Sequence, residues 1–222
     1  MKIGINLVGV SYNDGTIGRY RNYEDALEGF MSNVVNPLKE EGHEIFLYTF
    51  TYDSPKKDDI IKTYNPVKST FLDPNYNKMG GGDVLENTIK IISVTYINAL
   101  NELVGEDLDL VISTRFDISF NINPFKQFNY EFDKFNFFFR EPILKTVPLV
   151  CDTFYVFPHS MTENFIEAII DMETNPKDGV NIAMHNMLRP IQKFVGEQNV
   201  KYVCDEYYSS LENPFYKLTR HG

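Results

Sequence analysis

The chain has 222 residues, 43% hydrophobic and 23% charged, which is the composition of a globular protein large enough for a sizeable core. Its formal net charge is −10 and it contains no long run of Lys or Arg, which argues against a general nucleic-acid binder. No apolar stretch reaches the roughly 18 residues that a membrane-spanning helix needs.

The first 50 residues have the pattern of a βαβ unit. The apolar stretch 2–10 predicts a central strand, and a loop rich in turn residues follows over 11–22. Apolar residues at helical spacing then predict an amphipathic helix over 23–38, with Gly42 as its stop. The stretch 44–50 predicts a second strand, which such a unit would pair in parallel with the first.

The next 70 residues extend this unit to βαβαβ. Pro55, Pro66 and the "GGG" at 80–82 predict an irregular segment over 51–83, with the glycines as a linker. Apolar spacing predicts a helix over 84–104. A third strand is then expected within 107–120.

The second half of the chain is also expected to alternate strands and helices. Strands are predicted at 134–141, 151–158 and 200–208. A Ser-x-x-Glu capping box at 160–163 is expected to open a helix that turns Phe165, Ile166, Ile169 and Ile170 inward. The stretch 179–196 is expected to carry a later helix with Pro190, which can kink it. The chain is therefore predicted to be one Rossmann-like α/β domain over 1–222, with a mostly parallel central sheet flanked by helices.

The two cysteines indicate a reducing compartment. Cys151 and Cys204 lie in apolar stretches and fit no zinc-ligand spacing, so we expect buried free thiols. The N-terminal stretch 1–10 is too short for a secretory signal. We therefore expect a cytoplasmic protein without a membrane span.

The third predicted strand ends in the charged pair Arg115 and Asp117. Strand alternation places both side chains on one side, with Phe116 on the other. Ligands of open α/β sheets gather at such strand ends, so we expect the carboxylate to line a cleft there. It could hold a divalent cation or a sugar hydroxyl, while the guanidinium could pair with phosphate. A plain surface ion pair is the alternative, and the spacing alone does not decide between them.

The motif "DLVISTRFDISF" (109–120) resembles the GT-A-fold glycosyltransferases, nucleotide-sugar-dependent enzymes with one Rossmann-like domain. It is similar to the group that has Arg-x-Asp in place of the metal-binding Asp-x-Asp. The stretches 1–50, 151–165 and 185–203 resemble further segments of that family in the same order. The resemblance implies a nucleotide-sugar-binding half, 1–120, and an acceptor-side half, 121–222.

The resemblance also implies an activity and its partners. A sugar would pass from a UDP- or GDP-sugar donor to a hydroxyl of a glycan acceptor, with no nucleic acid involved. A divalent metal, Mn²⁺ or Mg²⁺, would be held by Asp117 and His185. The remaining implied donor contacts divide into residues bordering the base and arginines facing the phosphates, namely Gly9 and Val10, and Arg115 with Arg19 or Arg21.

Asp152 is the candidate general base that an inverting enzyme would need for the acceptor hydroxyl. It lies beside Cys151 and before Phe154, so partial burial is expected, and a strand-end residue that caps a local amide is the alternative. His185 could instead touch a phosphate as a cation, or be a structural histidine.

Two alternative functions stay open. The first is a non-catalytic nucleotide- or sugar-binding domain on the same fold. The second is an interaction domain, which would have an exposed apolar patch, with Arg115 and Asp117 paired only with each other and no cleft beside them.

Overall fold

A computed structural model describes the chain over residues 1–15, 19–73, 84–144, 147–175 and 183–220. Its strands are β1 (Lys2–Val8), β2 (Tyr12–Asn13), β3 (Arg21–Asn22), β4 (Glu44–Tyr52), β5 (Lys68–Leu72), β6 (Leu110–Arg115), β7 (Ile118–Phe120), β8 (Phe135–Leu144), β9 (Val147–Val150), β10 (Phe154–Pro158), β11 (Val200–Tyr207) and β12 (Tyr216–Leu218). Its helices are α1 (Glu24–Phe30), α2 (Asn36–Glu40), α3 (Lys57–Tyr64), α4 (Val84–Asn101), α5 (Pro124–Gln127), α6 (Thr162–Thr174) and α7 (Leu188–Val195).

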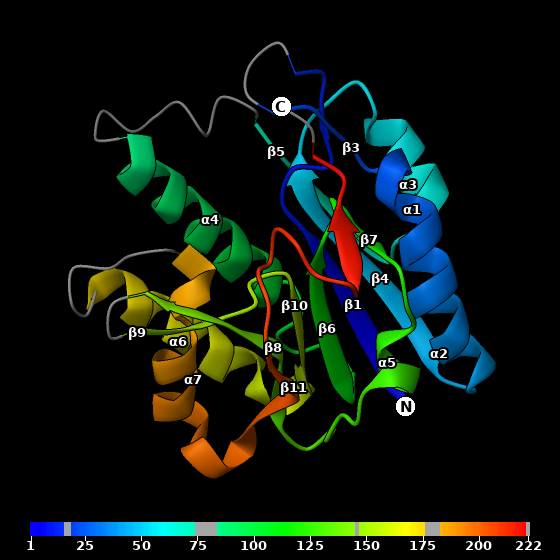
Figure 1. Ribbon diagram of the computed structural model, residues 1–222. Coiled ribbons are helices and arrows are strands. Elements are labelled where there is room, and N and C mark those ends of the chain that lie inside the picture. Colours follow the sequence, from blue (N-terminus) through cyan, green and yellow to red (C-terminus); the bar gives the residue numbers. More distant parts are fainter. Residues whose placement is uncertain (16–18, 74–83, 145–146, 176–182, 221–222) are drawn as a thin grey trace.

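Eight of the described strands form one sheet, in the order β11-β8-β10-β6-β1-β4-β5, and β9 pairs with β8 beside this path (Figure 1). The strands β6, β1, β4 and β5 are parallel to one another. Because β10 is antiparallel to both β6 and β8, and β11 is parallel to β8, β10 alone runs against the other described strands of the path. The sheet is therefore mostly parallel, as predicted.

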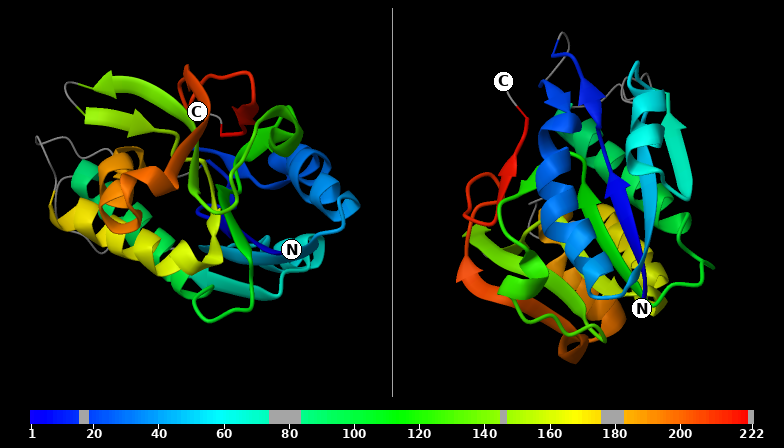
Figure 2. Two further views of the ribbon diagram at one scale, coloured as in Figure 1. Left: turned by 90° about the horizontal axis from the view of Figure 1, so that it is seen from below. Right: turned by 90° about the vertical axis from the view of Figure 1, so that its right-hand side faces the viewer.

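Helices cover both faces of this sheet (Figure 2). Buried residues of α1, α2 and α3 form one apolar cluster with one face, and those of α4, α6 and α7 form a second cluster with the other. Strand alternation divides neighbouring residues between them, since Leu110 and Ile112 of β6 belong to the first cluster and Val111 to the second. The uninterrupted apolar sequence of β6 follows from this burial on both faces.

The βαβ unit predicted for the first 50 residues is confirmed. A π-helical stretch, Met31–Val35, joins α1 to α2 in one long helical segment, and β1 pairs in parallel with β4. Gly42 follows the segment with a φ of +85°, and its N–H donates to the carbonyl of Lys39 at 3.0 Å. This left-handed residue ends the helix as the sequence predicted.

The prediction of an irregular segment over 51–83 was wrong in part, because α3 and β5 lie within it. Pro55 and Pro66 lie on either side of α3 and leave its hydrogen bonds intact. Strand β5 pairs with β4 at the edge of the sheet and is only partly buried, so its sequence lacks a strong apolar signal. The stretch 80–82 lies outside the described residues.

The strands predicted in the second half are present as β8, β10 and β11, but two details of its helices differ. Phe165, Ile166 and Ile169 of α6 are buried as predicted. The helix begins at Thr162 without a side-chain cap, and Ile170 is 39% exposed, so the capping box and the inward-facing Ile170 were both wrong. Pro190 lies in the first turn of α7, where a missing N–H costs nothing, so it does not interrupt that helix.

The environment of the thiols agrees with the sequence prediction. Cys151 and Cys204 are both buried and free. Within the described part of the chain, every helix falls short of the length and apolar character that crossing a membrane requires.

Candidate functional site

The carboxyl ends of β1 and β6 lie side by side in the middle of the sheet. Strand β1 pairs with β4 on one side and with β6 on the other, so the strand order reverses at this point. Ligands of open α/β sheets bind at such a reversal. Val8 pairs with Arg115, and Gly9 follows with a φ of +103°, where an added Cβ would meet no atom within 4 Å. Gly9 and the half-buried Val10 thus border open space at this strand end.

Arg115 and Asp117 form a bidentate ion pair. Nε of Arg115 donates to Oδ1 of Asp117 at 2.9 Å, and Nη2 donates to Oδ2 at 2.7 Å. The Asp117 side chain is only 5% exposed, so it does not line an open cleft as expected. Burial disfavours its ionised form, but Arg115 and then Arg21 outweigh burial and hold the pKa of Asp117 below its usual range. Asp117 is therefore an internal anchor for guanidinium groups.

Arg21 reaches this carboxylate from the β2-β3 hairpin. Its Nε lies 3.7 Å from Oδ2 of Asp117. The hairpin is tied to the sheet by Ser11, whose N–H donates to Oγ1 of Thr51 at 3.1 Å. Burial, together with the positive charges of Arg115 and Arg19, lowers the pKa of Arg21. Arg19 itself is exposed, so the hairpin presents one half-buried and one exposed arginine.

The antiparallel pairing of β10 with β6 brings Asp152 to the same place. Phe154 pairs with Thr114, and Oγ1 of Thr114 donates to the carbonyl of Thr153 at 2.9 Å. Asp152 precedes this contact, and its Oδ2 lies 3.4 Å from Nη1 of Arg115. Arg115 therefore bridges two carboxylates that lie 35 positions apart in the printed sequence, Asp117 and Asp152.

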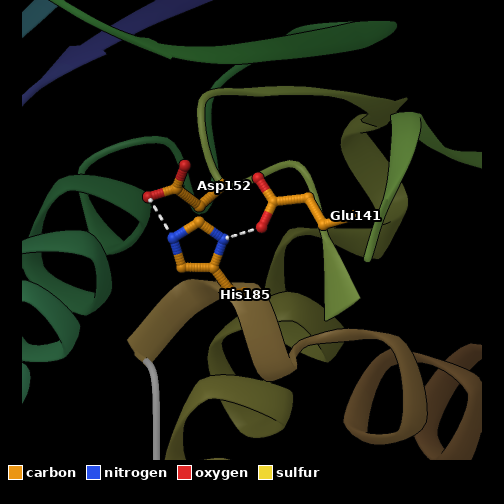
Figure 3. A group of neighbouring side chains, drawn as sticks. All are labelled: Glu141, Asp152 and His185. Carbon is orange, nitrogen blue, oxygen red and sulfur yellow. Dashed lines mark ion pairs between the residues drawn. The ribbon is translucent and has the colours of Figure 1, made fainter. Parts of the chain in front are cut away.

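His185 lies between Asp152 and Glu141 (Figure 3). Its Nε2 is 3.4 Å from Oδ2 of Asp152, and its Nδ1 is 2.7 Å from Oε2 of Glu141. The 3-10 helix Ala183–Asn186 carries His185, and Glu141 belongs to β8. The other oxygen of Glu141 accepts from the backbone N–H of Ser210 at 2.9 Å and from the Ser210 hydroxyl. These bonds fix Glu141 and thereby the orientation of the imidazole.

The ionisation of His185 should make the free energy of unfolding depend on pH. Burial opposes the imidazolium, but Asp152 and Glu141 outweigh burial and raise the pKa of His185 to about 8. Because this pKa exceeds the unfolded value near 6.5, the stabilisation is complete below about pH 6.5 and is lost as the pH rises through 8. In buffer with a chelator, the stability advantage of the wild type over His185→Gln should shrink by about 2 kcal/mol between pH 6 and pH 9.

Urea denaturation at each pH measures this difference, and an NMR titration of the imidazole gives its midpoint directly. A constant difference between the two proteins, with an imidazole midpoint near 6.5, would contradict the ion-paired imidazolium.

Glu141, Asp152 and His185 could hold a divalent metal. Each offers one ligand atom, and the three atoms lie within 4.8 Å of one another. Two carboxylates and one imidazole suit a cation such as Mn²⁺, and Oδ1 of Asp152 is buried without a hydrogen-bond partner in the described part of the chain. Asp117 and His185, which the resemblance implied as joint metal ligands, are not adjacent, because Arg115 and Asp152 lie between them.

The structure links most of the predicted site residues through ion pairs, in the order Arg21, Asp117, Arg115, Asp152 and His185. Sequence reasoning missed two participants. Glu141 is a buried acid that follows the phenylalanines within β8, and a charge in such a strand was the available signal. Arg220, near the C-terminal end, offered no sequence signal.

Comparisons with known proteins address the fold. No family model matches the sequence, and no curated protein matches it. Among solved structures, the galactosyltransferase LgtC in complex with donor and acceptor sugar analogues is similar at 11% identity, over 91% of this chain and 73% of that chain, with a TM-score of 0.53. An active-site mutant of LgtC is similar at 10% identity, over 91% and 72% of the two chains, also with a TM-score of 0.53. The chain therefore has the fold of the GT-A glycosyltransferases.

Proposed function

We propose that this protein is a glycosyltransferase that moves a sugar from a nucleotide-sugar donor to a hydroxyl of a glycan acceptor. The observation that supports it best is the position of the charged group. Arginines and an acid with a free oxygen meet at the strand reversal between β1 and β6, on a GT-A-like fold. We assign the whole range 1–222 to one domain, with the donor on 1–120 and the acceptor on 121–222.

The reaction breaks the bond between the sugar and the donor diphosphate, and negative charge develops on the leaving oxygen. Arg21 and Arg115, with the exposed Arg19, supply positive charge where the diphosphate would lie. Guanidinium groups bind phosphate oxygens with two parallel hydrogen bonds. Gly9 and Val10 leave space for the base. The Arg-x-Asp motif thus works as a cationic platform, in which Asp117 holds the arginines in place.

Asp152 is the proposed general base. The acceptor oxygen forms the new bond to the sugar, and its proton passes to Oδ1 of Asp152. That oxygen has no partner within the described structure, while Oδ2 is oriented by Arg115 and His185. A base held on one oxygen leaves the other to take the proton, and because Oδ1 is buried, the acceptor hydroxyl must enter the site to reach it.

As the alternative role for Asp152, a divalent metal, Mn²⁺ or Mg²⁺, would be held by Glu141, Asp152 and His185. Bound there, it would offset charge on the leaving diphosphate. Because His185 is protonated below about pH 8, the metal would displace a proton, and its affinity should rise with pH. The buried free thiols Cys151 and Cys204 support a cytoplasmic location.

The interaction-domain alternative is disfavoured by the contacts of the pair. It requires Arg115 and Asp117 to pair only with each other, but Arg115 also contacts Asp152, and Asp117 also contacts Arg21.

Calorimetric titration tests the proposal. UDP- and GDP-sugars are titrated into the protein with and without manganese, and at least one donor should bind at micromolar to millimolar concentration. Transfer to a glycan acceptor is then measured with that donor. Failure of every donor to bind at millimolar concentration would refute the proposed function.

A further inference from the structure

The C-terminal end of the described chain returns to the candidate site. Strand β12 pairs antiparallel with β7, which directly follows the Arg-x-Asp motif. Beyond this pairing, the backbone N–H of Thr219 donates to the backbone carbonyl of Asp117 at 2.9 Å. Arg220 therefore lies beside the motif, although about 100 residues separate them in sequence.

The Arg220 side chain is half-buried among charges of both signs. Burial and the positive charges of Arg115 and Arg21 lower its pKa, while Asp117 and Asp152 raise it. Three arginines thus act on Asp117, whose two oxygens are already bonded to Arg115. The three guanidinium groups of Arg21, Arg115 and Arg220 face two carboxylates, those of Asp117 and Asp152, so positive charge is in excess among these five groups, in a protein whose net charge is −10.

The donor groups of these arginines are not equally available. Arg115 directs Nε and Nη2 to Asp117 and Nη1 to Asp152. Arg220, by contrast, has no side-chain hydrogen bond or ion pair with any residue that the structure describes. A guanidinium that is held half-buried next to like charges, with its donors unused, is arranged for an anion from outside the protein.

We propose that Arg220 is a further donor-binding residue, which binds the diphosphate together with Arg21 and Arg115. The proposal rests on the proposed function, and it adds β12 to the donor site. Two features support a diphosphate over a single carboxylate. Arg21 and Arg220 come from different elements, β3 and the segment after β12, and both act on Asp117, while a diphosphate offers oxygens on two phosphorus atoms to both.

The test compares Arg220→Gln with Lys217→Gln. Both variants lose one positive charge near the C-terminal end, but Lys217 is exposed on β12 and makes no described contact with the site. UDP, uridine and inorganic pyrophosphate are titrated by calorimetry at fixed ionic strength, and thermal melting confirms that both variants fold. R220Q should weaken UDP and pyrophosphate binding about tenfold and leave uridine binding unchanged. K217Q should change all three by less than twofold.

The outcomes separate this inference from the proposed function. If wild type binds UDP but R220Q binds it equally well, Arg220 is not a donor residue and the proposed function is untouched. If the wild type binds pyrophosphate through Arg220 but binds no nucleotide-sugar, Arg220 is confirmed as an anion-binding residue and the proposed glycosyltransferase activity is refuted. If neither UDP nor pyrophosphate binds the wild type, the Arg220 inference is overturned, and the proposed function is decided by the titrations with the UDP- and GDP-sugars.

Discussion

Replacing Arg115 with Met should lower the free energy of unfolding by about 3 kcal/mol, because it leaves the buried carboxylate of Asp117 without its bidentate partner. The neighbouring Arg21, at 3.7 Å, offsets part of the loss, so we expect the lower end of the range for broken buried ion pairs. Equilibrium urea denaturation at pH 7 measures the change.

The double variant R115M with D117N shows whether the unpaired charge is the cause. Because Asn carries no charge, the double variant should regain most of the stability that R115M loses. Lys2→Met, which removes a surface ion pair with Asp107, should have a far smaller effect. If R115M and the double variant are equally unstable, the loss comes from packing and not from the buried carboxylate.

The sequence predicted the parallel half of the fold well, because its signals are local. Apolar stretches and helical spacing marked β1, the helix that starts at Glu24, β4 and β6. Strand β5 escaped prediction because it lies at the edge of the sheet, where one side of the strand remains solvated. Helix α3 escaped prediction because Pro55 and Pro66 indicate breaks in regular structure, whereas they flank the helix.

The candidate site could be predicted only in part, since its contacts join distant segments. The sequence singled out Arg115 and Asp117 as a pair, but it did not show that their charges would turn toward each other in a buried position. The ion pair between Asp152 and Arg115 depends on the register of β10 against β6. The ion pair between Glu141 and His185 depends on how β8, β9 and the 3-10 helix pack. No local pattern encodes such registers.

Replacing the proposed general base, Asp152, should have the largest effect on the rate of sugar transfer. Asp152→Asn keeps the shape of the side chain but cannot accept a proton, so transfer should fall about 10²- to 10⁴-fold while donor affinity changes only a few-fold. Calorimetry with the donor and a transfer assay with the acceptor measure the two quantities separately. A wild type that binds donor and transfers nothing would instead identify a non-catalytic binding domain.

Asp205→Asn is the matched control, because it makes the same chemical change on an exposed side chain of the acceptor-side half. It should transfer at the wild-type rate. A metal-ligand role for Asp152 predicts a different result from that of a base: D152N would then lose the effect of manganese on donor binding, and excess manganese would restore part of the transfer. Loss of transfer with manganese-dependent donor binding intact therefore assigns proton transfer to Asp152, because only the base is needed after the donor has bound.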